Sequence, residues 1–224
     1  QISLPVNKRI LDSQIENPYQ VLSNLIVEKT LPYGMNAFIQ IGFNKTFHAI
    51  RTRNINAPIA GTYNSSNLDS SLYPFGKDSG NIFQTESSGI TKGKYIVFSL
   101  GIPRLRFARI DINYAIRDSK DNLVLGSGSS NPYDFSNEFS VSDNNVKHAF
   151  FVINALKLPL VFRLNNIFNL SSGQPYNMFI GRDINGDNLF LERPALTTNS
   201  TKTGVVLTPF GLLDPSPSPT EKII

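Results

Sequence analysis

The chain has 224 residues, a net charge of +4 from 21 basic and 17 acidic residues, and no Cys or Trp. The absence of Cys excludes a disulfide framework and thiolate metal sites. The basic residues are spread along the chain and are not interleaved with stacking aromatics, which argues against a nucleic-acid partner. We interpret the densest basic groups, Arg51/Arg53 and Arg104/Arg106/Arg109, as solvated or headgroup-facing charges.

Turn-forming residues recur through the chain, and this spacing predicts an all-β fold. The first predicted hairpin joins residues 19–31 to a strand beginning at Met35, through the short turn Pro32-Tyr33-Gly34. In its second strand apolar side chains alternate with polar ones. The apolar set is Met35, Ala37, Ile39, Ile41 and Phe43; Phe38 is an exception on the polar side.

The second predicted hairpin has its turn at Ile102-Pro103-Arg104, after a strand over residues 94–102. The strand that follows has the clearest two-faced pattern in the chain. One face carries Ala108, Ile110, Ile112, Tyr114 and Ile116, and the other carries Arg109, Asp111, Asn113 and Arg117. Such alternation is typical of a strand with one apolar and one polar side.

The third predicted hairpin pairs residues 146–158 with a strand that follows the turn Leu158-Pro159-Leu160. Asn166 and Ile167 break the phase of this last strand. Its apolar face is otherwise formed by Phe162, Leu164, Phe168 and Leu170, opposite Arg163, Asn165 and Asn169.

Long polar connectors, residues 51–92 and 118–145, separate the three hairpins. We therefore predict an antiparallel up-and-down meander of about six strands, with short turns at one end and long loops at the other. Two architectures fit: an open segment of an outer-membrane β-barrel, or one face of a secreted or surface β-sandwich that binds ligands such as glycans. Alternation alone does not separate them.

Several segments of the chain, in order, resemble a passage near the C-terminal end of the barrel in Oar-like TonB-dependent receptors of Gram-negative outer membranes. The main segments are residues 146–151 (VKHAFF), 168–177 (FNLSSGQPYN), 181–187 (GRDINGD) and 192–194 (ERP). The resemblance extends to residues 51–58 (RTRNINAP), 86–89 (ESSG) and 208–211 (TPFG).

This resemblance implies a fragment of a barrel of about 22 strands in the bacterial outer membrane. The expected organisation is a lead-in over residues 1–18, a barrel segment over 19–195, and a Pro/Ser-rich outward loop or tail over 196–224. The parent protein would bind a ligand and move it across the outer membrane. Its partners would be lipid, its own plug domain, the remaining barrel strands and the TonB complex.

An acidic loop follows the third hairpin. Asp183, Asn185 and Asp187 alternate, and Glu192 lies a little further on, so several oxygen donors lie within reach of one Ca²⁺. The pair Asn185-Gly186 also predicts a tight β-turn with positive φ, and the turn is the favoured interpretation. If a metal binds, we expect it to order an exposed loop and to take no part in chemistry.

The barrel interpretation also supplies a candidate ligand-facing set. Arg109, Asp111, Asn113 and Arg117 would line the lumen and contact the plug or a passing solute, whereas on a sandwich they would be plain surface. No nucleophile elbow or phosphate-binding loop is present in the sequence. We therefore expect a protein that is not an enzyme.

Overall fold

The computed structural model describes residues 7–105, 107–123, 131–135 and 138–216. Within them the chain is all-β, with three short 3₁₀ turns, Pro32–Gly34, Leu68–Ser70 and Lys77–Ser79. In this part of the chain, no helix has the length and hydrophobicity needed to cross a membrane. The strands are β1 (Lys8–Leu11), β2 (Tyr19–Thr30), β3 (Asn36–Asn54), β4 (Ile82–Leu105), β5 (Ala108–Asp121), β6 (Ser140–Val141), β7 (His148–Lys157), β8 (Arg163–Ser171), β9 (Ala195–Thr197), β10 (Val206–Thr208) and β11 (Gly211–Asp214).

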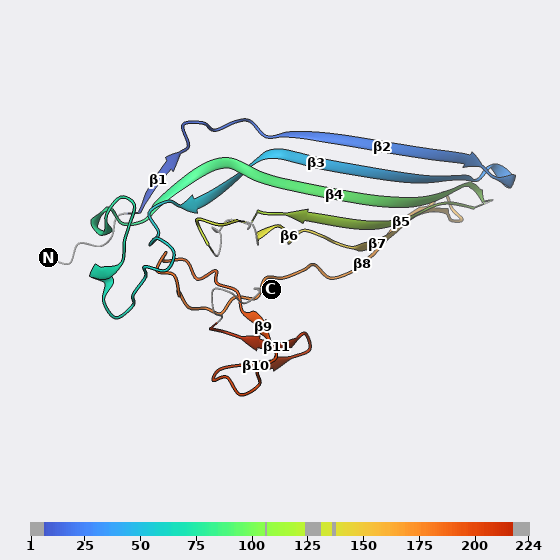
Figure 1. Cartoon of the computed structure of the whole chain (residues 1–224). Helices are drawn as coiled ribbons and strands as arrows, with labels where there is room; N and C mark the ends of the chain where they lie inside the picture. The colour runs from blue at the N-terminus through green and yellow to red at the C-terminus, as the bar shows by residue number, and fades with distance from the viewer. Residues whose placement is uncertain (1–6, 106, 124–130, 136–137, 217–224) are drawn as a thin grey trace.

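The main sheet is an open antiparallel meander, as predicted. Its strand order is β2-β3-β4-β5-β7-β8, so the six long strands pair in the order in which they occur in the chain. The sheet is not closed, because β2 and β8 each pair on one side only among the described strands. Figure 1 shows the tight reversals gathered at one end and the long connections at the other.

Two of the three predicted short turns lie where expected, and one does not. The first is the 3₁₀ turn Pro32–Gly34, and the third lies between β7 and β8, where Leu158 N–H donates to the Phe162 carbonyl at 2.9 Å. The prediction of a turn at Ile102-Pro103-Arg104 was wrong. Strand β4 continues to Leu105, with an irregularity in its pairing to β5 after Ile102, so the reversal falls later.

The long connectors are shorter than predicted, because the strands are longer. The first spans residues 55–81 instead of 51–92, since β3 runs to Asn54 and β4 begins at Ile82. The second contains β6, which pairs with β5. Within the lead-in of residues 1–18, β1 pairs in parallel with β4. At the boundary between the predicted barrel segment and tail, β9 begins a separate three-stranded sheet with β10 and β11, and residues 217–224 lie outside the described part.

One face of the main sheet is apolar across all six strands of the meander. Residues in register share a face, and one row crosses the sheet through Val27, Ile39, Phe98, Tyr114, Phe150 and Leu170. The neighbouring row contains Ala37, Leu100, Ile112, Val152 and Phe168. Several of these side chains are exposed, including Val27 by 62%, Phe98 by 41% and Leu170 by 61%, and the rest are half-buried.

The opposite face is mostly polar. Its rows include Gln40, Ser99, Asn113, Asn169, Asp111 and Arg117, with Phe38, Phe151, Ile26, Ile153 and Ile167 as large apolar members. Tyr95 lies across Gly42 on this face, where a side chain at position 42 would overlap its ring. The Tyr95 hydroxyl donates to Asn24 Oδ1 at 2.6 Å and accepts from Gln40 Nε2 at 3.2 Å.

Polar side chains are among the most deeply buried of the described residues. Among the described residues, the largest fully buried side chains are Asn54, Asn56, Asp187 and Asp214, whereas the buried apolar residues are mainly alanines. Within the described residues, therefore, no conventional apolar core lies beneath the main sheet. The order of the loop-bearing end comes from hydrogen bonds between loops.

Candidate cation site

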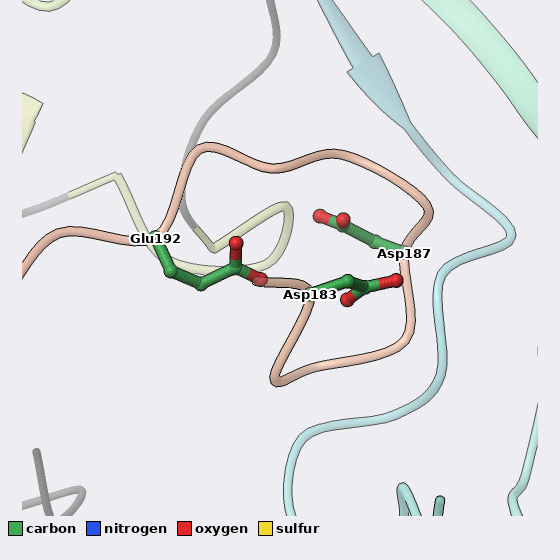
Figure 2. A group of neighbouring side chains, drawn as sticks. All are labelled: Asp183, Asp187 and Glu192. Atoms are coloured by element: carbon green, nitrogen blue, oxygen red, sulfur yellow. The ribbon is translucent and has the colours of Figure 1, made fainter. Parts of the chain in front are cut away.

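Three carboxylates converge in the loop between β8 and β9. One oxygen atom from each of Asp183, Asp187 and Glu192 lies within 4.8 Å of the other two. Figure 2 shows their side chains extending into the space enclosed by their own loop. Asp187 is 1% exposed and Glu192 is 5% exposed, so two of the three are shielded from water.

The loop holds its carboxylates through its own backbone. Asp183 accepts hydrogen bonds from the N–H groups of Gly186 at 2.6 Å and Asn188 at 2.9 Å. Asp187 Oδ1 accepts from Leu189 N–H at 2.7 Å. Gly186 has φ of +78°, so the predicted positive-φ turn and the carboxylate cluster occur in the same loop.

Asn185 contributes to this geometry through Asp187. Its Oδ1 accepts from the Asp187 N–H at 2.9 Å, and its Nδ2 donates to Asp187 Oδ2 at 3.3 Å. Glu192 Oε1 accepts from Ile184 N–H at 3.2 Å. Glu192 Oε2 is buried and has no hydrogen-bond partner among the described residues, which is costly for a carboxylate oxygen.

The electrostatics of the loop favour a proton or a cation. Burial, followed by the nearby charges of Glu192 and Asp183, raises the pKa of Asp187 to about 7. Burial also raises the pKa of Glu192. Within the described part of the chain, no ion pair includes any of the three carboxylates. A hard cation such as Ca²⁺ would neutralise them with the oxygen ligands that it prefers.

Asn54, the last residue of β3, fastens the acidic loop to the main sheet. Its Nδ2 donates to the Asp187 carbonyl at 3.1 Å and to Asn81 Oδ1 at 3.0 Å. Its Oδ1 accepts from the N–H groups of Asn56 and Ile82. Asn54 is fully buried, so these bonds are shielded from competing water.

An aromatic ring closes the other side of the loop. A side chain at Gly186 would overlap the Tyr63 ring and touch Pro58, so the loop and the ring are in close contact. The pKa of the Tyr63 hydroxyl is raised, first by burial and then by the negative charge of Asp183, with smaller contributions from Tyr73 and Glu192. A tyrosine thus lies beside the carboxylates.

The structure places the predicted ligand-facing set on the polar face of β5. Arg109 and Asp111 form an ion pair at 3.0 Å, with the Arg109 side chain 67% exposed. Asn113 lies opposite Ser99 on β4, and Arg117 lies opposite Tyr95. The set is therefore a stripe along one strand, separate from the acidic loop.

The interpretation of Arg51 and Arg53 as solvated or headgroup-facing was wrong for Arg51, which is mostly buried. Arg53 is partly exposed, but it is also held in an ion pair. Both bind Glu86, at 3.0 and 2.8 Å, and the Arg51 side chain is only 11% exposed. The Arg51 guanidinium also lies 3.5 Å from the centre of the Phe135 ring. Glu86 reaches them by strand pairing between distant segments, a relation that the local sequence does not signal. In the second basic group, Arg106 lies outside the described residues.

A second buried ion pair also escaped the sequence interpretation. Arg193 Nη2 lies 3.0 Å from Glu138 Oε2, with the side chains 8% and 2% exposed. Arg193 directly follows Glu192, so this pair anchors the C-terminal arm of the acidic loop to the connector before β6. Only the acidic spacing around Asp183 was visible in the sequence.

Comparison of the chain with models of protein families, with curated proteins and with solved structures found no match in any of the three.

Proposed function

We propose that this chain is a wall segment of an outer-membrane TonB-dependent receptor whose parent protein binds a ligand and moves it across the outer membrane. The observation that carries the proposal is the exposed apolar face of the six-stranded meander. On β5 this face runs from Ala108 to Ile116, eight residue steps, or about 27 Å at the usual rise of a strand. A barrel's lipid-facing band is about 25 Å tall.

The asymmetry of the connections supports the same proposal. Barrels of this class have short turns on the periplasmic side and longer loops outside. In this orientation the turn Pro32–Gly34 is periplasmic, and the acidic loop with Asp183 is on the outer side. A bound cation would then order an outward loop.

The polar face would surround the plug and the passing ligand. Its exposed charges, Arg109 and Arg117, and the partly exposed Asp111 lie along one strand, facing away from the apolar rows. The open edges at β2 and β8 would pair with further strands of the parent barrel. Energy would arrive through TonB, and no catalytic step belongs to the proposal.

The rival function is a secreted or surface β-sandwich binding module. A sandwich buries the apolar face of each sheet against a second sheet. Within the described residues, large apolar side chains of the main sheet remain exposed, including Leu25 by 63% and Phe168 by 51%. We therefore favour lipid as the medium that this face contacts.

Cell fractionation tests the proposal on the full-length protein in its own host. We expect it to sediment with outer membranes and to resist extraction by carbonate or high salt. We also expect its mobility in detergent gels to change on heating, because closed barrels stay folded in unheated detergent. Recovery in the soluble or secreted fraction would overturn the proposal in favour of the sandwich.

A further inference from the structure

Three lysines lie side by side in one row at the loop-bearing end of the main sheet. Lys45 of β3 is in register with Lys92 of β4, and Lys92 is in register with Lys120 of β5. These residues, here called the lysine row, occupy directly neighbouring positions on three adjacent strands. Neighbouring strands are about 4.8 Å apart, so the row is roughly 10 Å wide at its base.

The lysine row lies on the apolar face, where the apolar rows end. The next row on this face, two residues nearer the short turns on each strand, consists of Phe43, Lys94 and Asp118. The row after that consists of Ile41, Ile96 and Ile116. Lys94 and Asp118 pair at 3.4 Å. Along these strands toward the long loops, the apolar row is therefore followed by a row containing an ion pair and then by the lysine row, within four residues.

Like charges directly opposite each other destabilise a sheet, and here the juxtaposition occurs twice in succession. Within the described part of the chain, no ion pair includes a member of the lysine row. Two of the ammonium groups lie near aromatic rings, Lys45 at 4.1 Å from the centre of Phe47 and Lys92 at 5.1 Å from that of Phe139. An anion bridging the row would relieve the repulsion.

We propose that the lysine row binds the phosphate group of an amphiphile whose acyl chain lies on the apolar face beside Ile41, Ile96 and Ile116. A phosphate monoester offers several negatively charged oxygens, and each ammonium group has three donors. An acyl chain along the apolar rows places its headgroup at their end, where the lysine row lies. The inference rests on the proposed function, since it takes this face to contact lipid.

The test compares binding of dodecyl phosphate by the full-length protein in a neutral maltoside detergent, measured by native mass spectrometry. The variant replaces the lysine row with glutamines, Lys45→Gln, Lys92→Gln and Lys120→Gln together. A lysine near an anionic lipid surface contributes about fivefold in affinity, so we expect a loss on the order of a hundredfold for the triple variant. Single variants, expected to lose about fivefold each, serve if the triple variant does not fold.

The matched control is Lys29→Gln, which removes a lysine from the same face near the opposite end of the sheet. Binding equal to that of the unchanged protein is expected for this control. Equal binding by the lysine-row variants would overturn the inference. Inorganic phosphate that competes as well as dodecyl phosphate would also overturn it, because the site would then recognise a free anion.

Flotation with vesicles of phosphatidylcholine, which carries no net charge, separates this inference from the proposed function. If the protein does not associate with these vesicles, the proposed function fails, whatever the lysine row binds in detergent. If it associates and the lysine-row variants still bind dodecyl phosphate normally, only the inference fails.

Discussion

Asn54 and Asp187 are 133 residues apart in the chain and joined by a hydrogen bond of 3.1 Å, from the side-chain amide of the first to the backbone carbonyl of the second. This bond ties the last residue of β3 to the loop that carries the carboxylates. Asn54 is 0% exposed, and its amide group makes four hydrogen bonds in all.

Replacing Asn54 with Ala is expected to lower the free energy of opening of the acidic loop by about 3 kcal/mol, because several buried backbone and side-chain groups lose their partners. Hydrogen exchange of the amides around Asp187 measures this opening. The control is Asn67→Ala, which removes only a local cap of an exposed 3₁₀ turn. It should lower the stability of that turn by about 1 kcal/mol. Unchanged exchange at Asp187 in N54A would show that the bond does not hold the loop.

The raised pKa of Asp187 predicts a pH-dependent stability in the absence of metal. The folded state holds the proton more tightly than the unfolded state, whose carboxyl pKa is about 4. The stabilisation is therefore complete below pH 4 and is lost as the pH rises through about 7. Over this window the contribution is about 4 kcal/mol.

The measurement is denaturant unfolding in EDTA, followed by near-ultraviolet circular dichroism of the tyrosines. The Asp187→Asn variant lacks the titrating group, so at pH 8 it should unfold at a higher denaturant concentration than the unchanged protein, and at pH 4 the two should be similar. A constant difference between the two proteins from pH 4 to pH 8 would mean that Asp187 does not titrate as described.

Metal should reverse the effect of the same substitution. With saturating Ca²⁺ the unchanged protein is expected to be the more stable, since Asp183, Asp187 and Glu192 together neutralise the cation. Tb³⁺, which takes Ca²⁺ sites, should luminesce on excitation of Tyr63, whose ring contacts Gly186 in the loop. We expect Asp187→Asn to weaken binding about tenfold or more.

Two controls define the binding site. Asp69→Asn removes an exposed carboxylate that pairs with Lys77 elsewhere, and should leave Tb³⁺ affinity unchanged. Tyr63→Phe should lower the luminescence while calorimetry gives the same Ca²⁺ affinity. Equal Tb³⁺ affinity in Asp187→Asn and in the unchanged protein would place the metal elsewhere.

Glu86 forms ion pairs with two guanidinium groups, and removing its charge should lower the stability of the fold. Glu86→Gln leaves Arg51 and Arg53 without their carboxylate, and we expect the free energy of unfolding to fall by about 3 kcal/mol. Denaturant unfolding measures the change. The matched control is Glu16→Gln, whose side chain is 64% exposed beside His48 and should cost less than about 1 kcal/mol. Equal losses in both variants would contradict a special role for Glu86.

The sequence predicted what depends on local alternation. Strand β5 carries its two faces as expected, because apolar and polar residues alternate from Ile110 to Ile116, with Ala115 as the one neutral member of the polar face. The break of phase in β8 is also present, with Asn166 in register with Asn154 and Ile167 with Ile153. The first hairpin has its predicted pairing partners, and its turn includes a positive φ at Tyr33.

What the sequence did not predict depends on contacts between distant segments. Pro103 resembled a turn residue but lies inside β4, beside a pairing irregularity that accommodates it. The pairing of Glu86 with Arg51 depends on strand register. Asp187 is buried beside Asn54, which bonds to its carbonyl, and near Tyr63, whose ring contacts Gly186; Asn54 and Tyr63 are both distant from it in the chain.

Spin labels at Phe98 and Ser99 test most directly whether the apolar face contacts lipid. These neighbours on β4 point to opposite faces, and the chain has no Cys of its own. In membranes carrying the full-length protein, a label at Phe98→Cys should collide with dissolved oxygen and not with a water-soluble nickel complex, whereas a label at Ser99→Cys should be the more accessible to nickel. A label at position 98 that collides with neither reagent would indicate that a second sheet covers this face. A label at position 98 that collides freely with nickel would indicate that the face is in water. Either result would contradict a face that contacts lipid.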